Sequence, residues 1–196
     1  MTLSGRRTSV PVVEGTVMFT DIVGFTEFTA LRGDADALAL LSTQERLVLQ
    51  ELGSKGRIVK ELGDGLMLWF EDACDAVTTG IALQEQFDAQ SAASDLPLWV
   101  RIGAHAGRQM RRGDDLVGHD VNVAARIVQL AGPGEVVVSE ATVERVGSRL
   151  PGVAFDQLGP AVMKGIPGPV VLYRALPAPG RDSGAAPAVT GRFIER

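Results

Sequence analysis

The sequence has few metal-binding side chains other than carboxylates, and it has no long apolar run. Its 196 residues include one cysteine and two histidines, too few for a zinc site, which draws its usual ligands from these two residue types. The single cysteine cannot form an internal disulfide, which excludes a disulfide-stabilised secreted scaffold. No apolar run approaches the roughly 18 residues of a membrane span, and the N-terminus lacks a signal-peptide pattern. We therefore expect a cytoplasmic protein with no membrane segment.

A surplus of positive charge is also absent. Lys and Arg number 19 against 24 Asp and Glu, which gives a net charge of -5. An acidic chain binds nucleic acid or anionic lipid poorly, so neither is an expected partner. A polyphosphate ligand would need metal ions or a few well-placed cations. The length and the hydrophobic content of 45% fit one globular domain with a sizeable core.

The familiar nucleotide-binding and hydrolase motifs are missing as well. The sequence has no glycine-rich loop ending in Gly-Lys-Ser/Thr, no dinucleotide-binding fingerprint, no HExxH and no GxSxG. These absences disfavour P-loop, Rossmann, zinc-protease and serine-hydrolase chemistry. They direct the search for a site to the carboxylates.

The hydrophobic pattern predicts alternating strands and helices. Strands are expected at 16–22, 57–60, 66–70, 98–106, 135–138, 154–158 and 170–175. Helices are expected at 24–52 (with a break at Gly33 and Asp34), 71–90, 121–130 and 140–146. This order predicts an α+β fold with a ferredoxin-like βαββαβ core, additional C-terminal strands and a short helix, its helices packed on one face of the sheet. The domain is expected at 15–176, between a flexible lead-in at 1–14 and a mobile Pro/Ala/Gly-rich tail at 177–196.

Two acids stand where strands end. Asp21 closes the first strand and Asp64 lies in the turn of the 57–70 hairpin, so neighbouring strands would bring the two carboxylates together at one sheet edge. Carboxylate oxygens suit Mg²⁺ or Mn²⁺. The segment 22–26 then turns into a helix, whose first N–H groups could hold a triphosphate. Taken alone, each acid is better explained by a structural role, Asp21 as a helix cap and Asp64 as a turn former.

Five segments in order resemble the catalytic domain of class III adenylyl/guanylyl cyclases. They are 19–26 (FTDIVGFT), 60–65 (KELGDG), 101–107 (RIGAHAG), 115–126 (DLVG and VNVAAR) and 163–165 (MKG). The match extends over 14–176, nearly the whole predicted domain. The resemblance implies the nucleotidyl cyclase fold and formation of a 3′,5′-cyclic nucleotide with release of diphosphate.

The resemblance also implies a role for particular residues. Asp21 and Asp64, with Ile22, would bind two divalent cations, which lower the pKa of the ribose 3′-OH and neutralise phosphate charge. Asn122 would orient the ribose, and Arg126 would stabilise charge on the α-phosphate during in-line attack. The remaining phosphate-binding positions are Lys164 and the loop residues Ile22, Val23, Gly24, Phe25 and Thr26.

Base choice would depend on Lys60 and Asp115. A lysine donates to adenine N1 and an aspartate accepts from the 6-amino group, whereas guanine reverses this pattern. Each unpaired buried group costs about 1–3 kcal/mol, so ATP is favoured over GTP. The Lys/Asp pair is also the family's adenylyl pattern. Asp114 is the neighbouring alternative to Asp115, but the spacing to the 121–126 motif favours Asp115.

The family arrangement implies a head-to-tail homodimer with two shared active sites. Asp21 and Asp64 of one subunit would meet Asn122 and Arg126 of the other, and Lys60 would stand across the interface from Asp115. A guanylyl or mixed-specificity cyclase remains an alternative, as does a catalytically silent nucleotide-binding or partner-binding module. A diguanylate-cyclase relative is disfavoured because 61–65 is not a GGDEF-like turn.

Overall fold

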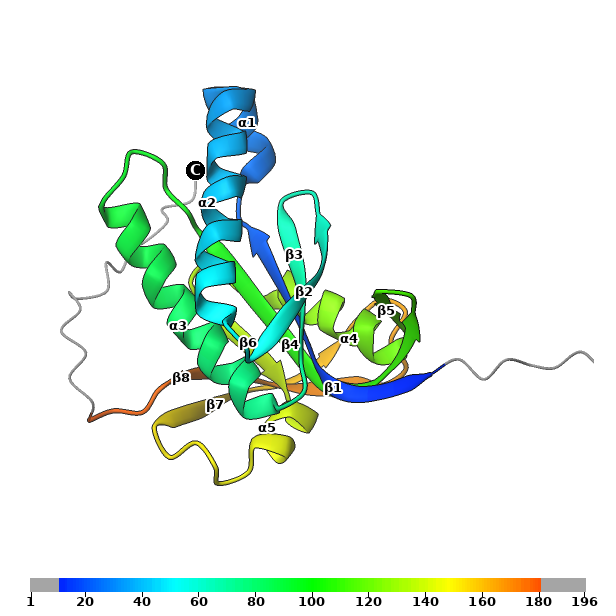
Figure 1. Ribbon diagram of the computed structural model, residues 1–196. Helices are drawn as coiled ribbons and strands as arrows, with labels where there is room; N and C mark the ends of the chain where they lie inside the picture. Colours follow the sequence, from blue (N-terminus) through cyan, green and yellow to red (C-terminus); the bar gives the residue numbers. More distant parts are fainter. Residues whose placement is uncertain (1–10, 181–196) are drawn as a thin grey trace, which may run out of the picture.

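An eight-stranded sheet forms the centre of the protein. The structure is a computed structural model and describes residues 11–180 (Figure 1). The strands are β1 (Val12–Ile22), β2 (Gly56–Leu62), β3 (Gly65–Phe70), β4 (Val100–Arg112), β5 (Asp115–Val117), β6 (Val136–Ser139), β7 (Val153–Val162) and β8 (Pro169–Pro177). Their order is β2-β3-β1-β4-β6-β8-β7, with β5 paired to β4 outside this path. The β2-β3-β1-β4 part is the predicted ferredoxin-like core, and β6, β8 and β7 are the predicted C-terminal additions.

Helices cover both faces of this sheet. They are α1 (Phe25–Arg32), α2 (Asp34–Leu52), α3 (Ala73–Ala92), α4 (His119–Ile127) with the 3₁₀ turn η1 (Val128–Leu130), and α5 (Glu140–Val146). In Figure 1, α2 and α3 lie side by side in front of the sheet and α4 lies behind it. The prediction that the helices pack on one face is therefore wrong for α4.

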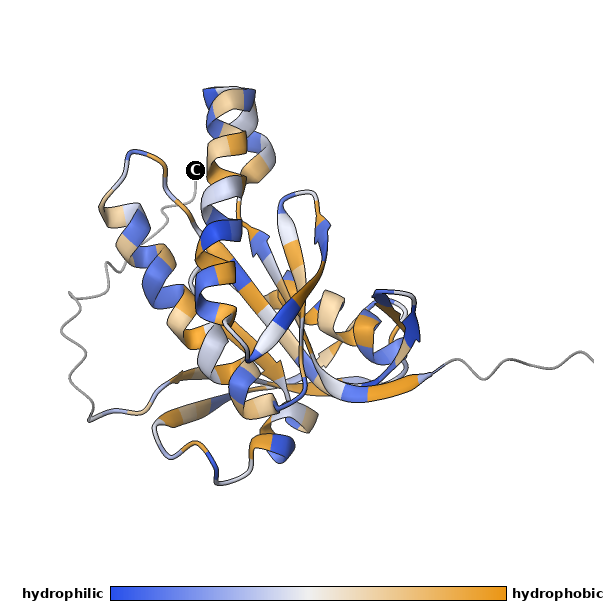
Figure 2. Cartoon of the chain, in the orientation of Figure 1, coloured by the Kyte–Doolittle hydropathy of each residue, from blue (hydrophilic) through white to orange (hydrophobic). Residues whose placement is uncertain are grey.

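The residues of β1 explain why both faces are covered. Met18 belongs to the large core under α2 and α3, whereas its neighbours Val17 and Phe19 belong to a second cluster with Val121 and Ala124 of α4. Alternate residues of a strand point to opposite faces, so a continuously apolar strand needs cover on both. Figure 2 shows the same pattern, with mostly apolar strands between helices that are polar on their outer side.

Two glycines of β4 let α4 approach the sheet closely. A Cβ on Gly103 would lie 2.5 Å from Val128 Cα and nearer still to the Val128 nitrogen. A Cβ on Gly107 would lie 2.6 Å from the Asp120 carboxyl carbon. Asp120 uses this space to accept a hydrogen bond from the Arg108 N–H at 2.6 Å. Both ends of the α4–η1 segment are thus seated on β4.

Several boundaries differ from the predicted ones. β1 begins at Val12, so residues 12–14, assigned to the lead-in, pair with β4. β4 begins at Val100 and continues to Arg112, beyond the predicted strand at 98–106, and turns into β5. β8 ends at Pro177, one residue inside the predicted tail. The rest of the lead-in and of the tail, 1–10 and 181–196, lies outside the described residues.

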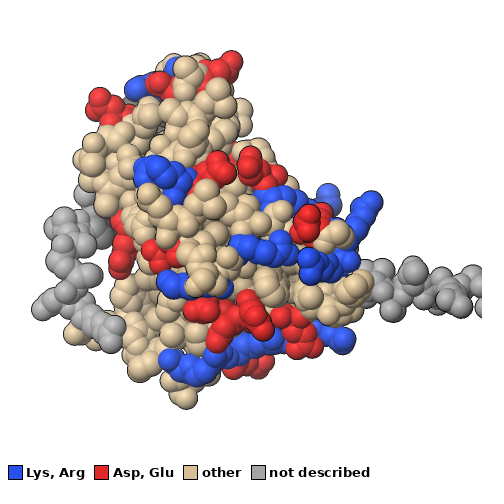
Figure 3. Space-filling view, in the orientation of Figure 1, with Lys and Arg blue, Asp and Glu red and all other residues tan. Residues whose placement is uncertain are grey.

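The described surface carries both signs of charge. Basic and acidic side chains are interspersed over the face seen in Figure 3. Ion pairs such as Arg149–Asp72 at 2.7 Å and Lys55–Glu51 at 3.2 Å join residues of the surface. None of the helices within residues 11–180 combines the length and the apolar character that crossing a membrane requires.

Candidate active site

Asp21 and Asp64 meet at the end of β1. Asp21 is opposite Gly65 in the β1–β3 pairing, and the Ile22 N–H donates to the Asp64 carbonyl oxygen at 3.2 Å. Partial burial and the nearby charge of Asp21 raise the pKa of Asp64, because both disfavour the ionised form of its carboxyl group. Two oxygen-donor groups in this position fit a hard cation such as Mg²⁺ or Mn²⁺. Within residues 11–180 no third His, Cys, Asp or Glu joins them, so other ligands would be main-chain oxygens, water or substrate.

Buried hydrogen bonds fix these strand ends from behind. The Gln44 side chain of α2 donates to Thr20 Oγ1 at 3.0 Å, and the same hydroxyl oxygen accepts from the Leu66 N–H at 3.2 Å. Both side chains are buried: Thr20 lies on β1, and Gln44 lies on α2, which packs against the sheet. Because Thr20 precedes Asp21, and Leu66 follows the Asp64 turn, this network sets the relative position of the two carboxylates.

Arg101 contacts the candidate site, although the sequence analysis did not single it out. It lies opposite Asp21 in the β1–β4 pairing, and its Nε donates to Asp21 Oδ2 at 2.6 Å. Its Nη2 donates to Gln129 Oε1 at 3.0 Å. A guanidinium at this place can hold a phosphate oxygen beside the carboxylates. Arg101 begins the 101–107 motif, but its contact with Asp21 joins residues 80 apart in the sequence, and the motif alone does not indicate that contact.

The loop after β1 retains only part of the predicted phosphate-binding surface. The Ile22 and Val23 N–H groups are used inside the protein, with the Val23 N–H donating to the Trp99 carbonyl oxygen at 2.8 Å. Gly24 then precedes α1 with φ of 72° and no side-chain cap. The first N–H groups of α1, those of Phe25 and Thr26, have no acceptor within the helix. The main-chain N–H groups of Ile22 and Val23 are therefore not free to bind an anion, whereas those at the start of α1 are not used within the helix.

Lys60 and Asp115 form an ion pair within one chain. Lys60 Nζ lies 2.8 Å from both carboxylate oxygens of Asp115. A bulge in β2 between Ile58 and Lys60 shifts the register there, the usual way to re-aim a strand side chain. Lys60 lowers the pKa of Asp115 by hydrogen bonding to its ionised form. The prediction that these two residues come from opposite subunits is corrected, because a single chain already brings them together.

Asn122, Arg126 and Lys164 make no polar contact with the carboxylates among the described residues. Asn122 and Arg126 are exposed and stand four residues apart on the outer side of α4, while Val123 and Ile127 are buried on its inner side. Lys164 is exposed in the turn before β8. The first part of β8 pairs with the end of β6, and β6 runs parallel to β4. This turn therefore lies at the opposite end of the sheet from Asp21, which pairs with the start of β4. No hydrogen bond or ion pair within the described range joins these three residues to the carboxylates.

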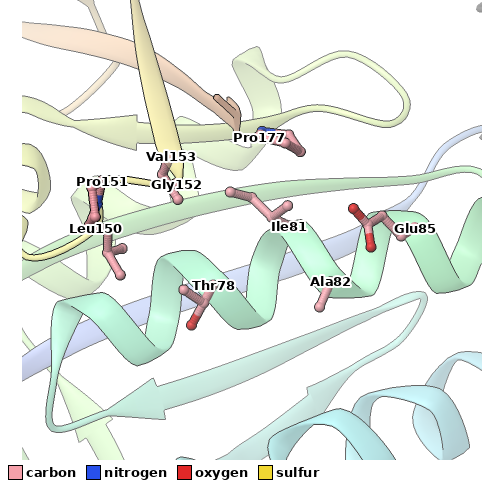
Figure 4. A pocket seen from close by; sticks show the side chains of 9 residues that line it. All are labelled: Thr78, Ile81, Ala82, Glu85, Leu150, Pro151, Gly152, Val153 and Pro177. Carbon is pink, nitrogen blue, oxygen red and sulfur yellow. The ribbon is translucent and has the colours of Figure 1, made fainter. Parts of the chain in front are cut away.

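The clefts of the surface lie mostly elsewhere. A cleft of about 370 Å³ separates α3 from the 150–153 segment and Pro177 (Figure 4). Ile81 and Glu85 of α3 point into it, and it contains none of the predicted site residues. A smaller hollow of about 190 Å³ borders Gly63 and Gly65, which flank Asp64.

An antiparallel ferredoxin-like sheet, with two carboxylates meeting at the end of its first strand, defines an α+β domain of the nucleotidyl cyclase fold. The chain belongs to the adenylate and guanylate cyclase catalytic domain family, whose profile matches residues 9–175. It is 34% identical over 163 residues to a putative adenylate cyclase of Rhizobium meliloti, and 30% identical over 161 residues to a pH-sensitive adenylate cyclase of Mycobacterium tuberculosis. These alignments cover 80% and 81% of this chain but 27% and 40% of the relatives. This chain therefore matches less than half the length of either relative.

Solved structures agree on the fold. The adenylyl cyclase CyaB from P. aeruginosa superposes with a TM-score of 0.74, covering 84% of this chain and 94% of that chain at 24% identity. At this level of identity the similarity establishes the architecture only.

Proposed function

We propose that this chain is an adenylyl cyclase domain that converts ATP to 3′,5′-cyclic AMP and diphosphate. The observation that carries the choice of ATP is the contact between Lys60 and Asp115, at 2.8 Å. An ammonium donor beside a carboxylate acceptor complements N1 and the 6-amino group of adenine, and would leave guanine with two mismatched groups. Both curated relatives described above are named adenylate cyclases, which supports the same choice.

The carboxylate end of the site would bind the triphosphate and its cations. Asp21 and Asp64, with the main-chain oxygen of Ile22, would hold two divalent cations, Mg²⁺ or Mn²⁺, which when bound activate the ribose 3′-OH and neutralise phosphate charge. Arg101 and the N–H groups of the Gly24–Thr26 segment would bind phosphate oxygens. Ile22 and Val23 would support that segment through their own hydrogen bonds.

A second subunit would complete the site. Asn122 would orient the ribose, and Arg126 would stabilise the charge that develops on the α-phosphate while the 3′-oxygen attacks. Lys164 would bind the terminal phosphates. Within the described residues no hydrogen bond or ion pair joins these three residues to the carboxylates of their own chain, and a head-to-tail homodimer would place each set against the complementary set of its partner.

The test measures cyclic nucleotides formed by the purified protein from ATP and from GTP, each with Mg²⁺ and with Mn²⁺. Cyclic AMP formation that is lost in Asp21→Ala and in Arg126→Ala is the expected result. Product mainly from GTP would establish a guanylyl cyclase instead, and product from neither nucleotide, by a folded dimer, would favour a silent binding module.

Mixing the two inactive variants tests the shared sites. A heterodimer of Asp21→Ala and Arg126→Ala chains has one intact site, and random exchange makes about half of the dimers heterodimers. The mixture should therefore recover about a quarter of the wild-type activity. No recovery, with heterodimers confirmed by native mass spectrometry, would contradict the shared-site arrangement.

A further inference from the structure

Arg57 stands at one end of a row of side-chain contacts that crosses the sheet. It is opposite Trp69 in the β2–β3 pairing, with its guanidinium carbon 5.7 Å from the centre of the indole ring. Trp69 Nε1 donates to Gln109 Oε1 at 3.2 Å, and the buried Gln109 side chain donates to the Gly15 carbonyl oxygen at 3.3 Å. The orientation of Arg57 is thus set by β1, β3 and β4.

The other side of Arg57 contacts the turn between β4 and β5. Its Nη1 donates to the main-chain oxygen of Asp114 at 3.3 Å, and Asp114 directly precedes Asp115. Within the described residues, one side-chain hydrogen bond joins β2 to this turn, from Arg57, and one joins β2 to the first residue of β5, between Lys60 and Asp115. Arg57 therefore joins the strand that carries Lys60 to the turn directly before Asp115.

The two ties behave differently when a base is present. Lys60 and Asp115 satisfy each other at 2.8 Å, so a base can enter between them only if that contact opens. The Arg57 bond uses the main-chain oxygen of Asp114, so separation of the Lys60 and Asp115 side chains does not require it to break. It then limits how far the carboxylate moves from the ammonium group. A rigid spacing of donor and acceptor is what a hydrogen-bonding site needs to reject the wrong base.

We propose that Arg57, oriented by Trp69, is a positioning residue that holds Lys60 and Asp115 at the spacing that selects adenine over guanine. This inference rests on the proposed function. It assigns the selectivity of the site to a residue that contacts neither the base nor the reacting atoms.

The experiment compares Arg57→Ala with wild type in steady-state kinetics on ATP and GTP. Because the variant loses a hydrogen bond from a charged donor, we expect KM for ATP to rise about tenfold. We expect kcat to stay within about twofold of wild type and KM for GTP to stay unchanged. Arg57→Lys keeps a cationic donor on a long side chain and should restore most of the selectivity. Arg46→Ala is the matched control, because Arg46 is an exposed arginine on α2 whose hydrogen bond to Gln50 is also 3.3 Å long. It should leave both KM values unchanged.

A second variant tests the role of Trp69. If the indole acts through Arg57, Trp69→Leu should reduce the selectivity for ATP, and Arg57→Ala/Trp69→Leu should reduce it no further than either single variant. Far-UV circular dichroism and urea unfolding identify any variant that fails to fold, in which case the comparison with Arg57→Lys decides.

Equal ATP-to-GTP ratios of kcat/KM in wild type, Arg57→Ala and Arg46→Ala would overturn the inference. So would an Arg57→Ala variant whose kcat falls equally for both nucleotides with no change in KM. A wild-type protein that forms no cyclic nucleotide would refute the proposed function alone. Equilibrium dialysis with labelled ATP and GTP would then still test the positioning, since wild type should prefer ATP and Arg57→Ala should not.

Discussion

Replacing Gly103 with alanine would put a methyl group where the backbone of η1 already lies. The added Cβ would stand 2.5 Å from Val128 Cα, about 1 Å closer than an ordinary contact allows. The obstacle is backbone, which cannot rotate away as a side chain can, so the α4–η1 segment must move outward. Overpacking of this kind costs about 1–3 kcal/mol of unfolding free energy. Arg126 lies two residues before Val128, and a displacement of about 1 Å at a catalytic group can lower kcat by about 100-fold.

Urea unfolding and steady-state cyclase kinetics measure the two effects in the same preparation. Gly132→Ala is the matched control, because its nearest obstacle is the flexible end of the Glu135 side chain at 3.3 Å. It should change stability by less than about 0.5 kcal/mol. A Gly103→Ala protein with control-like stability and full kcat would refute the idea that close seating of α4 on β4 positions Arg126.

Three other predictions concern the core, a helix cap and the carboxylates. Phe87→Ala should lower the unfolding free energy by about 3–5 kcal/mol in urea titrations, since this side chain is 1% exposed. Asp72→Ala removes the N-cap of α3 and should cost about 1 kcal/mol at pH 7. The pKa of Asp72 is lowered in the folded protein, so this contribution is present above pH 3.8 and the two unfolding curves should converge in acid. The pKa of Asp64 is raised, so Mn²⁺ binding, followed by electron paramagnetic resonance, should weaken on acidification at a pH above the ordinary 3.8. Asp21→Asn should move that loss to lower pH, and equal pH profiles would contradict the coupling.

The order of elements in the core was predictable because their hydrophobic periods are regular and their turns are marked by glycine. The far end of β4 was missed because residues 108–112 are mostly polar and carry no strand pattern of their own. They are extended because two strands pair with them: the first part of β1, with Val12 opposite Met110, and the short β5, with Leu116 opposite Arg111. The position of α4 was not predicted, because the spacing of apolar residues shows that a helix has an apolar face. It does not show on which face of the sheet the helix packs.

The same limit applies to the candidate site. Motif order indicated Asp21 and Asp64, and the strand pairing brings these two residues together at the end of β1. The contact of Lys60 with Asp115 in one chain depends on a β-bulge and on the curl of the β4–β5 turn toward β2, neither of which has a signal in a single sequence. The use of Arg101 as a partner of Asp21 likewise follows from strand register.

The central place of β1 has a consequence for how the protein folds. Its partners are β3, which follows after α1, α2 and β2, and β4, whose Arg101 is 80 residues beyond Asp21. The chain loses the entropy of closing so long a loop before the β1–β4 hydrogen bonds form, and this slows folding. A nascent chain that ends before β4 leaves one edge of β1 unpaired, with Val17 and Phe19 uncovered by α4, and such an edge is open to pairing with another chain. During synthesis, aggregation therefore competes with folding until β4 and α4 have emerged.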